Sequence, residues 1–124
     1  MELKKNRVLP ESQGNILCAE VGARVTLEDY EEVFYKNIQK IFQEHGSIRI
    51  LLHYSRPFLG WDIDAAAKDL AQVSESGSKV EKAALVNPPE QVHQRWKTMQ
   101  PLLSGELRIF EEGEFDKALE WIRS

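Results

Sequence analysis

The side chains that could do chemistry in this sequence are three histidines and a serine close to one of them. His45, His53 and His93 include no pair at the i, i+4 spacing by which two residues of one helix bind a metal. His53 and Ser55 could share one face of a strand, but Ser55 lacks the G-x-S-x-G context of a hydrolase nucleophile. We therefore expect surface or hydrogen-bonding histidines, no metal site and no catalytic residue.

Cysteine and glycine patterns indicate no further chemistry. Cys18 is the only cysteine, which excludes a disulfide within the chain, and its apolar surroundings favour a small core residue over a reactive thiol. Neither G-x-G-x-x-G nor G-x-x-x-x-G-K-[ST] occurs, so nothing in the sequence predicts a nucleotide phosphate site. We expect a protein without a cofactor.

The composition is that of one globular domain. The 124 residues are 42% apolar and 29% charged, and a net charge of −4 argues against nucleic acid as a partner. No segment approaches the length of about 20 apolar residues that spans a bilayer. A secretory signal has an apolar stretch after its basic start, and none follows "MELKKNRVLPES". A cytoplasmic protein is the expectation.

The first half of the chain predicts a hairpin, a long helix and a buried strand. Two apolar runs flank the turn-forming "PESQGN", so a hairpin is expected from about Arg7 to Val21. Thr26, with Asp29 three residues later, indicates a helix start, and Gly46 supplies the stop. Apolar residues recur between them at helical spacing: Leu27, Tyr30, Phe34, Ile38, Ile41 and Phe42. The unbroken run "SIRILLHY" is typical of a strand covered on both faces.

The second half predicts three helices and two strands. The segment "DIDAAAKDLAQVSES" predicts a helix that begins with Asp62 as its N-cap. Its expected inward face comprises Ile63, Ala66, Ala67, Leu70 and Ala71. Strands are expected in "GSKVEKAALVN" and "ELRIF". The helix between them takes Asn87 as its cap and buries Val92, Trp96, Met99 and Leu103. The last helix, in "EFDKALEWIRS", buries Phe115, Ala118, Leu119 and Ile122.

Strands that alternate with helices define the fold class. The order β-β-α-β-α-β-α-β-α predicts an α/β sandwich, with a four- to five-stranded, mostly parallel sheet and an antiparallel N-terminal edge hairpin. No repeat or linker divides the chain. Residues 1–124 are therefore expected to form a single domain.

An apolar cluster follows the strand "SIRILLHY", where a polar connecting loop is expected. Phe58, Leu59 and Trp61 stand in this segment, "HYSRPFLGWDID". In a parallel sheet, the loop after a strand borders the crevice where ligands bind. The cluster could cover the core, line a ligand site, or form a patch for a partner or a membrane. Trp96 lies on the apolar stripe of its helix, which favours a core position.

Four stretches carry a resemblance to a known family: "EVGARVTLEDYEEV", "IRILLHYSRPFLGWDIDAAAKDL", "KVEKAALV" and "LRIFEEGEFDKALEWI". Together they resemble the SpoIIAA-like family of STAS-related domains, from about Ile16 to Ile122. The resemblance implies a sheet flanked by helices, similar to anti-sigma-factor antagonists and to Sec14-like (CRAL-TRIO) lipid-binding domains. The shared positions are apolar, glycine and aromatic, so they specify a fold better than an activity.

The antagonist side of the resemblance implies a regulatory protein-interaction module. Phosphorylatable antagonists carry a serine near the start of the helix after the third strand. The corresponding stretch here, "FLGWDIDAAA", has Asp62 and Asp64 but neither Ser nor Thr, so the phosphate acceptor is missing. A carboxylate carries about one charge where a phosphate carries nearly two, which favours Asp62 as a helix cap over a permanent phosphate mimic.

The Sec14-like side implies a non-enzymatic domain that holds an apolar or lipid-like ligand between its sheet and movable helices, or touches a membrane surface. A peripheral membrane location would follow from the second option. The loop Phe58–Trp61 and the adjacent small alanines fit this interpretation. The candidate contact residues are Tyr54, Phe58, Leu59, Trp61, Ala65, Ala66 and Trp96. A homodimer is a further expectation, because self-association can also cover an apolar patch.

Overall fold

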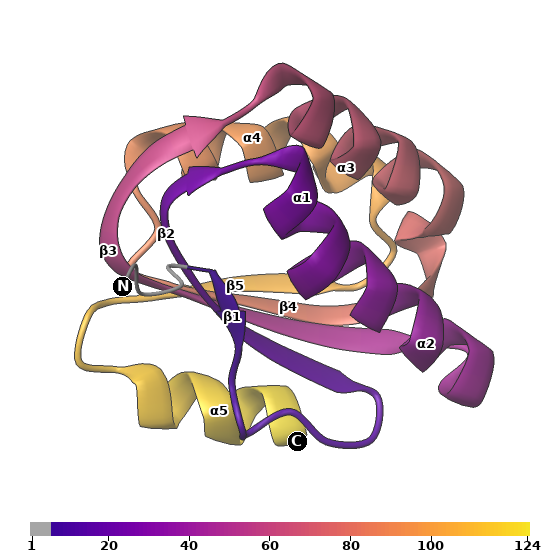
Figure 1. Cartoon of the computed structure of the whole chain (residues 1–124). Coiled ribbons are helices and arrows are strands. Elements are labelled where there is room, and N and C mark those ends of the chain that lie inside the picture. Colours follow the sequence, from indigo (N-terminus) through magenta and orange to yellow (C-terminus); the bar gives the residue numbers. More distant parts are fainter. Residues whose placement is uncertain (1–5) are drawn as a thin grey trace.

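The fold was taken from a computed structural model that describes residues 6–124. Residues 1–5, the first part of the basic start "MELKKNRVLPES", lie outside the described residues. Helices cover both faces of a five-stranded sheet (Figure 1). In chain order the elements are β1 (Arg7–Val8), β2 (Ile16–Val25), α1 (Leu27–Asp29), the π-helical turn η1 (Tyr30–Tyr35), α2 (Lys36–His45), β3 (Ile48–Trp61), α3 (Ile63–Ser76), the 3-10 turn η2 (Gly77–Lys79), β4 (Val80–Val86), α4 (Glu90–Met99), the 3-10 turn η3 (Gln100–Leu102), β5 (Glu106–Phe110) and α5 (Phe115–Arg123).

The sheet has the topology that the sequence predicts. Its strands lie in the order β1-β2-β3-β4-β5, with β1 antiparallel to β2 and the remaining neighbours parallel. Parallel neighbours need a crossover connection, and helical segments make each crossover from β2 to β5. The predicted α/β class, the element order and the antiparallel edge are confirmed.

Two hydrophobic cores lie on opposite faces of the sheet. The helices from α1 to α4 cover one face, and α5 lies on the other (Figure 1). The smaller core, under α5, contains Cys18, which is fully buried as predicted. Burial raises the pKa of the Cys18 thiol to about 11, so the group stays protonated and unreactive at neutral pH. The larger core, under α1 to α4, also contains the cavity described below.

The first long helix, residues 27–45, begins and ends where predicted. The Thr26 hydroxyl accepts a hydrogen bond from the Asp29 amide at 3.1 Å, and the Asp29 side chain accepts one from the Thr26 amide. Gly46 ends the helix in the left-handed conformation at φ 76°. Between these caps the turn η1 is π-helical, a rare geometry that is frequent at functional sites and that the sequence did not predict.

The predicted loop Phe58–Trp61 is wrong: this segment is the end of strand β3. β3 stays paired with β2 as far as Val25, which lies opposite Trp61. The register shifts twice on the way, and Gly60 adopts φ 105°. Pro57 lies within this irregular stretch, where proline is tolerated in a strand. Loop-like residue types therefore mark bulges here, and the strand carries its aromatic side chains over the larger core.

Helix α3 turns a different face inward from the one predicted. The predicted face comprises Ile63, Ala66, Ala67, Leu70 and Ala71. Of these only Ala66 is half-buried; the rest are exposed, and Ile63 is 89% exposed. The buried residues of α3 are Ala65 and Gln72. Val73 also packs against the larger core. The prediction failed because this face combines Ala65 and Val73 with the polar Asp69 and Gln72, which an apolar periodicity cannot reveal.

Helix α4 starts at a different cap from the predicted Asn87. Pro89 occupies the N-cap position, whereas Asn87 adopts the left-handed region at φ 56°. Its Nδ2 donates instead to the Tyr54 carbonyl and to Glu112 Oε2, each at 3.1 Å. Asparagine tolerates this backbone conformation, which explains the turn. The predicted burial of Val92, Trp96 and Met99 is confirmed.

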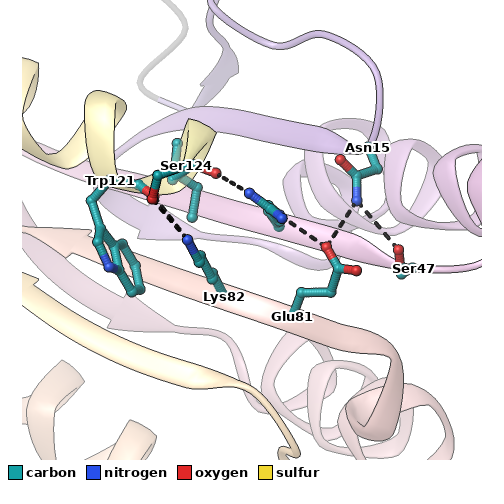
Figure 2. Close-up of polar contacts among 8 residues, drawn as sticks. Asn15, Ser47, Glu81, Lys82, Trp121 and Ser124 are labelled. Carbon is teal, nitrogen blue, oxygen red and sulfur yellow. Dashed lines mark hydrogen bonds and ion pairs between the residues drawn. The ribbon is translucent and has the colours of Figure 1, made fainter.

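Cationic side chains fasten the C-terminal end of α5 to the sheet (Figure 2). Lys82 Nζ donates to the Trp121 carbonyl at 3.2 Å and to Ser124 Oγ at 2.9 Å. Arg49 Nη1 donates to the Ile122 carbonyl at 3.0 Å. Positive charge at this end of a helix also complements the helix dipole. Two strands thus fix the position of the helix that covers the smaller core.

Candidate functional site

A cavity of about 80 Å³ lies between the sheet and the helices that cover the larger core. Strands β2, β3 and β4 supply one wall, and the segments from η1 to α4 supply the other. Most of the lining is apolar, including Leu17, Val21, Ile38, Ile48, Leu52 and Met99. Tyr30 and Phe34 of the π-helical turn also line it, so the unusual backbone geometry lies at the cavity wall.

The predicted contact residues of β3 and α4 divide into three groups. Tyr54, Trp61 and Trp96 line the cavity. Phe58 is buried between two of them, with its ring edge-to-face at 5.6 Å from Tyr54 and 4.7 Å from Trp61, measured between ring centroids. Leu59 points away and is 66% exposed. Phe58 and Trp61 face the same side although they are three residues apart, because register shifts interrupt the alternation in this part of β3.

The predicted contact residues at the start of α3 do not line the cavity. Ala65 is fully buried in the larger core, and Ala66 is half-buried. Asp62 occupies the predicted N-cap position, but its side chain makes no cap hydrogen bond. Its carboxylate pairs with the Arg24 guanidinium instead, and Asp64 Oδ1 accepts from the amide of Ala65. The position of the cap was predicted correctly and its side-chain role was not.

A polar cluster interrupts the apolar lining, and sequence reasoning missed it. Its members are Tyr30, Asp69, Gln72 and Arg95, from three different helical segments. The Tyr30 hydroxyl donates to Asp69 Oδ1 at 3.0 Å, and Arg95 Nη2 donates to Asp69 Oδ2 at 2.9 Å. Burial, reinforced by the Asp69 carboxylate, raises the pKa of Tyr30 above its ordinary value, so its hydroxyl remains a donor.

Arg95 connects this polar cluster to the aromatic residues of β3. Its guanidinium lies over the Trp61 ring, 4.6 Å from the centroid, a cation–π geometry. The same group donates to the carbonyl of Ala66 at 3.0 Å. One side chain of α4 therefore contacts both β3 and α3 at the cavity wall.

Two buried donors in the polar cluster have no partner within residues 6–124. Gln72 is 6% exposed; its Oε1 accepts from Gln39 Nε2 at 2.8 Å, but its own Nε2 is unpaired. Arg95 Nε is the second. Asp69 and Gln72 are three residues apart in α3 and so share a helix face. That polar i, i+3 pair is the available signal, but neither residue belongs to the predicted inward face of α3.

Two of the three histidines lie beside a carboxylate. His53 Nε2 lies 3.3 Å from Glu112 Oε1, and His45 Nε2 lies 3.8 Å from Glu44 Oε2. Ser55 is exposed. Across residues 6–124, no group of three or more His, Cys, Asp or Glu side chains is arranged to hold a metal ion. In that same part of the chain, every helix is too short or too polar to cross a membrane.

Comparison with known proteins gives a family. A family model described as SpoIIAA-like matches residues 16–123. A similar solved structure is the crystal structure of an uncharacterized protein of the DUF3478 family with a SpoIIAA-like fold, from Shewanella loihica PV-4. The two structures superpose over 98% of this chain and 98% of the other, with a TM-score of 0.71 and 20% sequence identity. This similarity shows a common fold. No curated protein matches the chain. Since the family model spans most of the sequence, this chain belongs to the SpoIIAA-like family.

Proposed function

We propose that this protein is a non-enzymatic binding domain that holds a small apolar ligand in the cavity between its sheet and helices. The observation that carries the proposal is the cavity itself, with its mainly aliphatic and aromatic lining. Ligand sites are typically concave and apolar, with a few polar groups that orient the ligand. The polar cluster around Asp69 and Arg95 supplies such groups.

The size of the cavity sets the size of the ligand. A water-sized group needs about 10–15 Å³, so a cavity of about 80 Å³ takes a chain of about six carbon atoms. Burial of each CH₂ contributes about 0.8 kcal/mol, and the loss of free motion on association offsets part of this gain. We expect a dissociation constant of about 1 mM or tighter for a ligand that fills the space.

Native mass spectrometry of the purified protein, with solvent extraction and analysis of any bound molecule, tests the proposal. We expect an apolar molecule to be retained by the wild type and lost from Val73→Phe, because Val73 lines the cavity and a larger ring there takes up its space. The matched control is Leu70→Phe on the same helix, since Leu70 is exposed and is not among the lining residues. No bound molecule in the wild type, together with no response to added benzene, would contradict the proposal.

A second candidate function is contact with a protein partner through an exposed apolar patch. Leu59 at the end of β3 and Ile63 and Leu70 of α3 are 66%, 89% and 47% exposed. Ile63 and Leu70 lie seven residues apart and so share one face of the helix. This surface adjoins the helix start that corresponds, by resemblance, to the regulatory site of anti-sigma-factor antagonists. Clustered exposed apolar side chains commonly mark contact sites.

Partner recovery in pull-downs distinguishes this second function. The double variant Leu59→Ser with Ile63→Ser should lose a partner that the wild type and Ile109→Ser retain; Ile109 is an exposed apolar residue of β5. Recovery of the same proteins by all three would count against a protein partner. Liposome flotation of the same variants tests whether this surface binds a membrane. Light scattering tests whether it binds a second copy of the chain.

A further inference from the structure

Strand β5 leaves one edge of the sheet without a neighbour. It pairs with β4 on one side, and within residues 6–124 no strand pairs with its other side. The opposite edge of the sheet is β1, which has only two residues against the five of β5. Of the residues of β5 only Phe110 is buried, whereas most of β4 is. A free strand edge of this kind is a template for pairing with another strand.

The backbone groups at this free edge belong to Leu107 and Ile109. The amide of Asn87 donates to the carbonyl of Phe110 at 2.8 Å, so the backbone of Phe110 faces β4. Because successive residues of a strand direct their N–H and C=O groups to alternate sides, Arg108 also faces β4. Leu107 and Ile109 therefore direct their N–H and C=O groups away from the sheet, where a further strand could bind them.

The side chains of β5 carry opposite charges two residues apart. Glu106 and Arg108 are exposed, and neither forms an ion pair with another residue of the described chain. Their spacing places them on one face of the sheet. This is the face of α5, since the Arg108 guanidinium lies over the Trp121 ring, 4.9 Å from its centroid. Two such strands are complementary when they run antiparallel about a two-fold axis at Leu107, because Glu106 of each copy then lies opposite Arg108 of the other.

Charge selects this register over its neighbours. An axis at Arg108 would place that residue opposite its own copy, and like charges directly opposite each other are destabilising. An axis at Ile109 would place Glu106 opposite Glu112 of the other copy, again with like charges. The axis at Leu107 also lets the two copies of Leu107 exchange both of their outward backbone hydrogen bonds.

We propose that β5 binds β5 of a second copy of this chain, so that two five-stranded sheets join edge to edge in a homodimer. The two-fold axis lies at Leu107, and a pair between Glu106 and Arg108 lies on each side of it. A pair of five-residue strands is a small contact, so the dimer is reversible and depends on protein concentration. No residue of β5 lines the cavity, and the inference is independent of the proposed ligand.

Charge reversal tests the inference by analytical ultracentrifugation over a range of protein concentrations. Arg108→Glu places glutamates opposite each other and Glu106→Arg places arginines, so each variant should dimerise at least about tenfold more weakly than the wild type. The double variant, which exchanges the two charges, should dimerise as the wild type does. An equimolar mixture of the two single variants should also form a dimer, because an acidic edge then meets a basic one. The matched control is Lys40→Glu, a charge reversal at an exposed position of α2, which should have no effect.

Three results would overturn the inference. The first is a wild-type protein that keeps the monomer mass of 14.3 kDa up to its solubility limit. The second is a dimer that both single reversals leave unchanged, and the third is a double variant that does not recover dimerisation. If the variants do not fold, amide hydrogen exchange of the wild type decides the question. The N–H groups of Leu107 and Ile109 should exchange more slowly as the protein concentration rises, and rates independent of concentration would overturn the inference.

Discussion

At the scale of single residues, Arg95 contacts two other elements of the larger core. Its guanidinium pairs with Asp69 of α3 and lies over the ring of Trp61 of β3. The side chains of Arg95 and Asp69 are only 20% and 23% exposed, so water compensates little when one partner is removed. The residue therefore holds α3, α4 and the end of β3 in one arrangement around the cavity.

Arg95→Met should lower the free energy of unfolding by about 2–3 kcal/mol, since it leaves a largely buried carboxylate unpaired. Adding Asp69→Leu to this variant should recover part of the loss. The matched control is Lys68→Met, whose pair with Glu31 is more exposed and should contribute less than about 1 kcal/mol. Urea denaturation of the four proteins measures these differences. Equal effects of the two single substitutions would show that the Arg95–Asp69 pair stabilises the protein no more than the exposed Lys68–Glu31 pair does.

At the scale of elements, the start of β5 lies against the start of β4 through a glycine. A Cβ atom on Gly105 would lie 2.2 Å from the carbonyl oxygen of Val80 and 2.3 Å from that of Glu81. No side chain fits at such distances, so the backbone itself must move to admit one. The approach of these two strands thus depends on the absence of a side chain at this position.

Gly105→Ala should destabilise the protein by about 2–3 kcal/mol, because the added methyl forces the two strands apart. Thermal unfolding followed by circular dichroism measures the effect. Ser78→Ala, at an exposed neighbouring position, should change the midpoint little. A midpoint for Gly105→Ala equal to that of the wild type would contradict the close approach.

The contact between β3, β4 and the end of α5 predicts a dependence of stability on pH. The hydrogen bond from Arg49, at 2.9 Å, lowers the pKa of Glu81 below its ordinary 4.5. Asn15 Nδ2 also donates to Glu81, at 3.2 Å (Figure 2). A lowered pKa in the folded state stabilises the protein above the ordinary value, and this stabilisation is lost as the pH falls through the folded pKa. The network thus contributes at neutral pH and not in acid.

Glu81→Gln should therefore lower stability at pH 7 by less than about 1 kcal/mol, because the side chain is largely exposed. The difference from the wild type should shrink towards zero as the pH is lowered below 4.5. Denaturation midpoints at a series of pH values measure it, with Glu75→Gln as an exposed control on α3. A difference that is constant with pH would contradict the role given to the Glu81 carboxylate.

Elements were predictable where local signals agree with the tertiary contacts. The helix from Thr26 to Gly46 carries both of its caps in the sequence, and its ends were confirmed. The end of β3 was not predictable from the sequence. Its proline and glycine are typical of turns, but here they lie where the strand register shifts. The inward face of α3 was missed for another reason. The contact of Asp69 with Arg95 joins residues 26 positions apart, which no local pattern encodes.

At the scale of the whole molecule, the two faces of the sheet differ in the side chains and cavities that they carry. The face under α5 carries the smaller core, and α5 is held there by Lys82 (Figure 2) and by Arg49. The opposite face carries the cavity, the π-helical turn and the two unpaired donors. Family membership and fold were within reach of the sequence, because apolar and glycine positions encode them. The polar cluster was not, since it assembles from three separate helical segments.

The three tryptophans report on these two faces separately. Trp61 and Trp96 line the cavity, whereas Trp121 belongs to α5 and packs on the smaller core. Nuclear magnetic resonance of the three indole N–H groups during titration with benzene, a six-carbon apolar probe, is the most direct test of a ligand site in the cavity. We predict saturable shifts of Trp61 and Trp96 and a constant Trp121 signal. Unchanged signals of Trp61 and Trp96 at the solubility limit of benzene would contradict the account.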